Sequence, residues 1–171
     1  MADTNPAGPN LADSKNNKLQ WGPILWQIFH LLAEISDKPE VLPLWKNWFA
    51  QTSRIMPCEK CRQHLQQYLR ANAFIRAKSA YKKGEPVRAH VRQELLQLHN
   101  HVNQNTGKPA FTTEQYTEKY GQKQKPEILL ETKNCLQELE KIWLPLDFFK
   151  LRKREFATWK RSFVMLYALL Q

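Results

Sequence analysis

Apolar residues recur every three to four positions along most of the chain, which is the spacing of one face of an α-helix. The first such stretch is 21–35, whose apolar face consists of Ile24, Ile28, Leu31, Leu32 and Ile35. Gly22-Pro23 precedes this face, and proline is tolerated in the first turn of a helix, so we expect the helix to begin there. Trp26 and His30 lie four positions apart and therefore share a face of it.

The same spacing continues in four further segments. It predicts a helix in 40–56, a third that begins near Cys58 after Pro57, a fourth in 86–105 and a short fifth in 112–121. Gly107 and Pro109 are stop signals after the fourth helix. Thr112 or Thr113 is the expected N-cap of the fifth. The charged segment 75–86 is interpreted as a connector.

Beyond these helices, the C-terminal third of the chain is interpreted as an appendage. Residues 126–143 are amphipathic, and 144–171 contain a further helix that is basic early and apolar late. The alternation of apolar and polar residues that marks strands is missing. The chain is therefore predicted to be all-α.

Composition and charge exclude few classes of function. The net charge is +10, which suits contact with nucleic acid, an anionic membrane or an acidic partner. Lys and Arg are spread along the whole chain without a dense tract, however, which favours an ordinary solvated surface. The polar N-terminal segment has no apolar core of a secretory signal, and the apolar run at 163–170 is too short to span a bilayer.

The chain has three cysteines, and two of them form the C-x-x-C pair Cys58 and Cys61. On a helix these residues face the same way, with Cα atoms roughly 5 Å apart, which permits a disulfide. The positive end of a helix dipole also favours a thiolate. A reactive dithiol is therefore one interpretation, although the βαβ pattern of thioredoxin-like proteins is missing.

Two other interpretations of the pair stay open on spacing alone. Cys58, Cys61 and His64 could supply three zinc ligands, with Cys135 or a histidine as the fourth, but the usual second ligand pair is missing. His99 and His101 are two apart and so point to different sides of a helix. The third possibility is a pair of half-buried thiols without a role.

Four segments, taken in order, resemble the Erv/ALR family of FAD-linked sulfhydryl oxidases. They are "WGPILWQIFH", "PCEKCRQHLQQYL", "LHNHVNQNTGKPAF" and "EKYG". The resemblance covers about 19–121 and implies a four-helix bundle with a short fifth helix that holds FAD. It leaves 1–18 as a disordered tail and 122–171 as a C-terminal helical extension.

The family motifs imply which residues carry the chemistry. The catalytic pair would be Cys58 and Cys61, and no resident metal is implied. The residues expected to bind FAD are Gly22, Trp26, His30, Tyr68, His99, Asn100, Val102, Asn103, Lys108, Phe111 and Tyr120, with Tyr120 standing where many members have Trp. Aromatic rings and imidazoles can stack on the flavin and adenine rings, and a lysine can meet a phosphate.

By the same resemblance, a substrate dithiol attacks Cys58 and the electrons leave through Cys61 to FAD and then oxygen, which yields hydrogen peroxide. The implied partners are thiol-containing proteins or a dithiol shuttle protein, together with a second copy in a homodimer. The rival hypothesis is a basic helical binding module or zinc-stapled scaffold that contacts nucleic acid. Cys135, on an apolar stripe, is expected to be a buried thiol rather than a shuttle.

Two departures from the family pattern bear on its source. Many cellular members carry a structural disulfide at the positions of Leu96 and Thr113, and many have a shuttle pair in a tail, whereas residues 1–57 contain no cysteine. Both features resemble the short oxidases of large DNA viruses. A viral protein would act in the infected cytoplasm or virion, and a cellular one in the mitochondrial intermembrane space.

Overall fold

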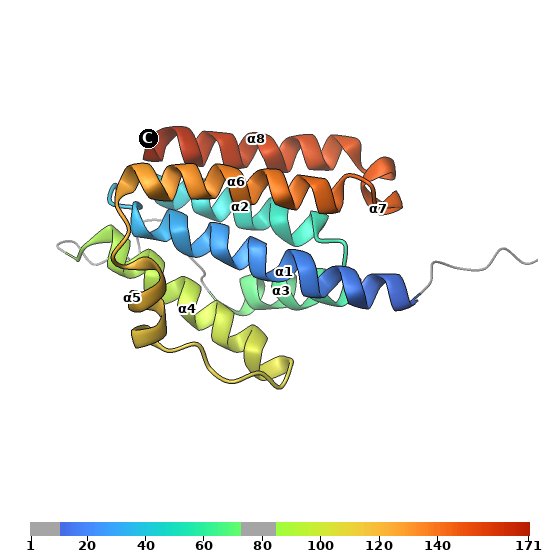
Figure 1. Cartoon of the computed structure of the whole chain (residues 1–171), viewed down its shortest axis with the longest axis horizontal. Helices are drawn as coiled ribbons and strands as arrows, with labels where there is room; N and C mark the ends of the chain where they lie inside the picture. Colours follow the sequence, from blue (N-terminus) through green and yellow to red (C-terminus); the bar gives the residue numbers. More distant parts are fainter. Residues whose placement is uncertain (1–10, 73–84) are drawn as a thin grey trace, which may run out of the picture.

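The computed structural model describes the backbone of residues 11–72 and 85–171, with side chains from residue 20 onward, and all regular structure within these ranges is helical (Figure 1). The helices are α1 Leu11–Glu34, α2 Val41–Ile55, α3 Glu59–Ala71, α4 Val87–Asn105, α5 Thr113–Tyr120, α6 Lys125–Trp143, α7 Asp147–Leu151 and α8 Lys153–Leu170. The prediction of an all-α fold is confirmed.

The start of α1 differs from the expectation. The helix begins at Leu11, so Pro23 lies inside it and the prediction that Gly22-Pro23 opens the helix was wrong. A proline inside a helix costs one backbone hydrogen bond, and burial of Trp21 and Leu25 on either side of Pro23, each 4% exposed, outweighs that cost. Part of the expected tail, 11–18, is therefore helical, while 1–10 and nearly all of the connector at 75–86 lie outside the described residues.

Residues next to the helix ends determine where α4 ends and where α5 begins, and both helices line the cavity described below. Gly107 has a φ of 66° and lets the chain turn back after α4, so that Lys108 N–H donates to the Asn103 carbonyl at 2.9 Å. Thr112 is the N-cap of α5 in a reciprocal capping box with Gln115, which confirms one of the two expected caps. The backbone therefore enters α5 in a fixed direction after the loop.

The helices form layers (Figure 1). On one side, α1 packs against α4 and α5, and α2 packs against α3. On the other side, α6 lies along α1 and α8 lies along α2. The C-terminal extension is thus a layer laid over the first two helices. No helix among the described residues has the length and apolarity to cross a bilayer.

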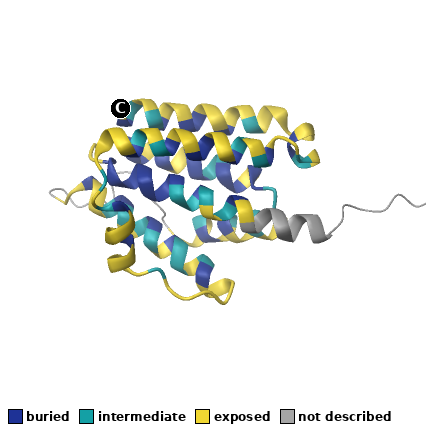
Figure 2. Cartoon of the chain, viewed as in Figure 1, coloured by how far each residue is buried: buried dark blue, intermediate teal, exposed yellow. Residues whose placement is uncertain are grey.

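A single hydrophobic core joins this layer to the bundle (Figure 2). Its largest side chains with less than 2% exposure include Trp48 on α2, Trp143 on α6 and Trp159 on α8. Two hydrogen bonds cross between the layers: Trp159 Nε1–H donates to Thr52 Oγ1 at 2.9 Å, and Asn47 Nδ2 donates to Ser162 Oγ at 3.0 Å. The extension therefore contributes to the same packed interior as α1 and α2.

A partly buried ion pair holds α4 against α1, and α5 contacts it through Tyr116. Arg92 on α4 donates to both carboxylate oxygens of Glu34, whose side chain is 4% exposed. The Arg92 guanidinium also lies 5.5 Å from the ring centroid of Tyr116 on α5. Tyr116 in turn donates its hydroxyl to the backbone carbonyl of His30 at 3.2 Å. These contacts hold together α1, α4 and α5, which also line the cavity described next.

Candidate functional site

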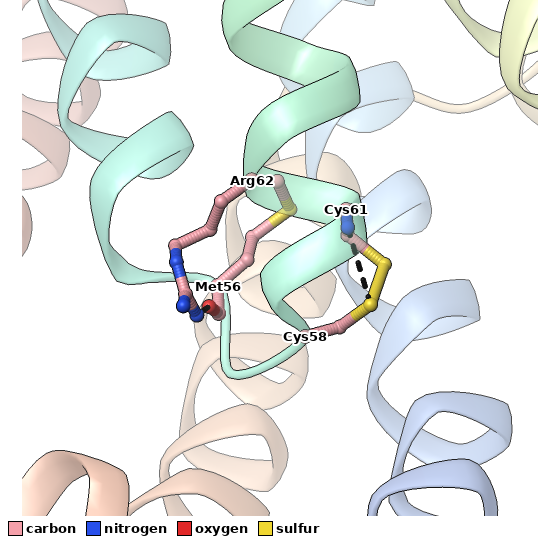
Figure 3. The surroundings of a disulfide bond; sticks show 4 residues. All are labelled: Met56, Cys58, Cys61 and Arg62. Atoms are coloured by element: carbon pink, nitrogen blue, oxygen red, sulfur yellow. Dashed lines mark hydrogen bonds between the residues drawn. A yellow bond between two sulfur atoms is a disulfide. The ribbon is translucent and has the colours of Figure 1, made fainter.

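The C-x-x-C pair lies at the start of α3 and forms a disulfide (Figure 3). The Cα atoms of Cys58 and Cys61 are 5.2 Å apart, and Cys58 caps the helix, its sulfur accepting the backbone N–H of Cys61 at 3.2 Å. Both residues are half-buried. A helix N-terminus favours negative charge on a cysteine sulfur. The pair is therefore placed for thiol–disulfide exchange.

Beside this disulfide lies a cavity of about 770 Å³, lined by residues of α1 to α5 and of the loop between α4 and α5. This volume falls within the roughly 300–1,000 Å³ typical of ligand sites. Of the two cysteines, Cys61 lines the cavity and Cys58 does not. The residues expected to bind FAD that also line it are Gly22, Trp26, Tyr68, His99, Val102, Asn103, Lys108, Phe111 and Tyr120.

One wall of the cavity is a stack of aromatic rings. The rings of Trp26 and His99 are nearly parallel, with centroids 4.1 Å apart and an angle of 6° between the planes. His30 lies behind them, fully buried, with its Nε2 2.9 Å from Nδ1 of His99. One of these two nitrogens must carry the hydrogen. The contact fixes the orientation of the His99 ring toward the cavity.

Two of the expected cofactor residues, His30 and Asn100, do not line the cavity. His30 instead supports His99 from behind. Asn100 clamps the loop after α4, because its amide nitrogen donates to the Phe111 carbonyl at 3.0 Å and its amide oxygen accepts the Phe111 N–H at 2.7 Å. A motif can place a residue at a site without telling whether it touches the ligand or holds its neighbour.

The two histidines are neutral at pH 7. Burial and the nearby positive charges of Lys108 and Lys119 lower the pKa of His99 to about 4. Burial, with His99 and Lys119, lowers the pKa of His30 to about 3. The cavity thus combines the uncharged imidazole of His99, which is available for stacking, with the positive charges of Lys108 and Lys119. Such a donor set suits a ligand with flat rings and phosphate groups.

These pKa values predict a loss of stability in mild acid. Both imidazoles have their ordinary pKa of about 6.5 in the unfolded chain, which therefore binds more protons as the pH falls below 6.5. The free energy of unfolding should drop between pH 6.5 and about 4, by up to about 1.4 kcal/mol per pH unit for each imidazole. Urea titrations across this range measure the slope.

The matched variant for this test is His99→Phe, which keeps a ring against Trp26 but removes the titrating group. Its unfolding free energy should change less steeply with pH than that of the parent protein. An identical slope in both proteins would show that His99 does not titrate on unfolding in this way.

Sequence reasoning missed some of the cavity residues. Lys119 lines the cavity and lies 5.3 Å from the ring centroid of Tyr120. It is an exposed lysine on a short helix, and although it lies within the family-like segment "EKYG", only Tyr120 of that segment was expected to contact FAD. Phe29, Met56 and His64 also line the cavity. Phe29 has the pattern of an ordinary core residue.

The zinc interpretation finds no ligand set in the part of the chain that the structure describes, where no three His, Cys, Asp or Glu side chains are grouped for a metal ion. Cys58 and Cys61 are joined to each other instead. Cys135 is buried on α6, and burial together with nearby Glu131 and Glu138 raises the pKa of its thiol to about 11. The prediction of a buried thiol is confirmed.

The fold and this site define a helical protein with a disulfide beside a cavity. Residues 23–121 match the sequence profile of the Erv1 / Alr family. Because this match covers more than half of the chain, the protein belongs to the Erv1 / Alr family. The matched range holds α2 to α5 and the part of α1 that carries Trp26 and His30.

Among characterised relatives, the chain is similar to the FAD-linked sulfhydryl oxidase ERV1 of Oryza sativa subsp. japonica. The two are 29% identical over 113 residues, which is 64% of this chain and 54% of the rice protein. The chain thus spans about half the length of the curated relative that it matches. No solved structure matches the chain.

Proposed function

We propose that this protein is an FAD-dependent sulfhydryl oxidase that forms disulfide bonds in thiol-containing substrates. The observation that carries the proposal is the position of Cys61, which belongs to a half-buried disulfide and also lines a cavity of about 770 Å³. Membership of the Erv1 / Alr family and the similarity to the rice enzyme support it. A substrate dithiol can reduce this disulfide, and the cavity beside Cys61 offers a site for the group that accepts the electrons in turn.

The residues around the cavity fit an FAD molecule. Trp26 and His99 present parallel rings, and Lys108 and Lys119 supply positive charge for phosphates. Phe111 and Tyr120 add further aromatic surface. FAD, when bound, supplies a two-electron acceptor that oxygen reoxidises with formation of hydrogen peroxide.

The chain's own contribution is thiol–disulfide exchange. A substrate thiolate attacks Cys58 Sγ, the new sulfur–sulfur bond forms, the Cys58–Cys61 bond breaks and Cys61 leaves as a thiolate. The second substrate thiol, once deprotonated, attacks the substrate sulfur of this mixed disulfide and releases Cys58. The substrate leaves as a disulfide, and two electrons stay on the reduced pair. Cys61 then holds its sulfur at the cavity wall, and the helix N-terminus stabilises its negative charge.

Purified protein tests the proposal directly. We expect it to be yellow, to release FAD on denaturation and to consume oxygen when dithiothreitol is added. Absorbance near the flavin band and an oxygen electrode provide the two readings. A colourless protein that neither takes up FAD after reconstitution nor consumes oxygen with a dithiol would overturn the proposal.

The finer assignments are part of the same proposal. The substrates are thiol-containing proteins or a dithiol shuttle protein, and the protein acts as a homodimer, as the family resemblance implies. Many cellular members have cysteines at the positions of Leu96 and Thr113. The lack of cysteine there supports assignment of this protein to the branch of the family from large DNA viruses. In that branch the protein works in the infected cytoplasm or virion.

A further inference from the structure

A basic aromatic cluster lies next to the disulfide-bearing turn. It consists of Arg62, Phe148 and Arg152, which we call the basic rim. The guanidinium carbons of Arg62 and Arg152 lie 4.7 and 4.8 Å from the centroid of the Phe148 ring. Arg62 comes from α3, while the other two come from the C-terminal extension. Two positive charges from distant parts of the chain therefore share one aromatic ring.

The basic rim holds two positive charges close together without an ion pair among the described residues. Burial and the charge of Arg152 both lower the pKa of Arg62. Neither guanidinium has an ion pair among the described residues, and the adjacent Asp147 pairs with Lys150 at 2.8 Å. Glu59 is exposed and raises the pKa of Arg62, but it accepts a hydrogen bond from Gln63 rather than from the rim. The rim thus presents unpaired positive charge.

The basic rim lies near the reacting sulfurs in the first turn of α3. The backbone N–H of Arg62 donates to the carbonyl of Cys58 at 3.0 Å, so both residues belong to the first turn of α3. Arg62 Nη1 also donates to the Met56 carbonyl at 2.5 Å. Figure 3 shows the Arg62 side chain leaving this turn on the side away from the disulfide. Arg62 follows Cys58 by four residues, which is about 6 Å along the helix axis. An extended segment of a few residues therefore spans the distance from Cys58 around the turn to the rim.

We propose that the basic rim docks an acidic segment that flanks the reactive cysteines of the substrate protein. This inference rests on the proposed function and names the class of its substrate. Guanidinium groups bind carboxylates through paired hydrogen bonds, and the Phe148 ring limits the entropy lost when the two arginines are held for them. A nucleic acid also binds arginines, but contact with the turn of Cys58 favours a ligand that brings a thiol to that sulfur.

The test compares two dithiol peptides of the same length, one flanked by glutamates and one by lysines. Serine versions of both, labelled with a fluorophore, report binding by anisotropy without any turnover. We expect the acidic peptide to bind more tightly, with a preference that falls as salt rises. Arg152→Glu should weaken binding of the acidic peptide about three- to tenfold, and Arg152→Gln should weaken it less.

Arg161→Glu is the matched control, because Arg161 is an exposed arginine on α8 about 13 Å along the helix axis from Arg152. It should change acidic-peptide binding by less than about twofold, and neither variant should change oxidation of dithiothreitol. Equal binding of both peptides, an equal loss with Arg161→Glu, or tighter binding of a single-stranded oligonucleotide that Arg152→Glu abolishes would overturn the inference. Failure to oxidise dithiothreitol would instead overturn the proposed function, since the binding comparison does not depend on turnover.

Discussion

Cys61→Ser should lower oxygen consumption with any dithiol by at least about a thousandfold, while FAD stays bound. The substitution removes the sulfur that lines the cavity and that must leave when a substrate attacks Cys58. It leaves the Trp26–His99 stack and the lysines of the cavity in place. Oxygen-electrode rates and flavin absorbance after gel filtration measure the two effects separately.

Cys135→Ser is the control for this change, because Cys135 is a buried thiol on α6 that forms no disulfide in the structure. Its rate should stay within about twofold of the parent protein. In the Cys61→Ser variant, Cys58 should also form a stable adduct with a peptide activated as a pyridyl disulfide, which mass spectrometry detects. Turnover by Cys61→Ser at the parent rate would contradict the assigned role of Cys61.

Trp159→Ala should destabilise the protein by about 3–5 kcal/mol, the usual cost of deleting a fully buried tryptophan. Trp159 is 0% exposed, lies against Trp48 and Trp143, and donates its indole N–H to Thr52 Oγ1. The loss is a large part of the stability of an ordinary domain. Chemical denaturation followed by circular dichroism and by flavin release gives the change.

The same experiment tests whether the C-terminal extension unfolds together with the bundle. Because the extension and the bundle share one core, both signals should follow a single transition in the parent and in Trp159→Ala. Met165→Ala, at a position on α8 that is 52% exposed, should change the unfolding free energy by less than about 0.5 kcal/mol. An early transition that leaves flavin binding intact would indicate an extension that unfolds on its own.

Much of the fold could be predicted because helical periodicity is a local property. The bounds of α2 to α6 agree with the apolar spacing within a few residues. The start of α1 was misplaced because Pro23 is a typical residue of the first helical turn, whereas the helix continues through it with Trp21 and Leu25 buried on either side. The pairing of α6 with α1 and of α8 with α2 could not be predicted, because an amphipathic pattern shows which face of a helix is buried but not which helix covers it.

The site shows the same division between local and long-range information. Cys58 and Cys61 stand out by their spacing, and the cavity residues His99 and Lys108 stand out through family motifs. The basic rim could not be found in this way, because Arg62 is far in sequence from Phe148 and Arg152, and these two lie outside the family-like segments. Whether His30 touches a ligand or supports His99 also depends on three-dimensional placement.

The arrangement of α6 and α8 also limits how this protein can associate with others. These helices occupy the apolar faces of α1 and α2 with residues of the same chain. A second copy therefore cannot use those faces unless α6 and α8 first move away. The outward sides of the two covering helices remain available, and there Leu130, Val164 and Met165 are each more than half exposed. The cavity lining contains no residue of α6 or α8 among the described residues. Self-association through that outer layer would therefore leave the disulfide and cavity of each copy outside the contact between copies.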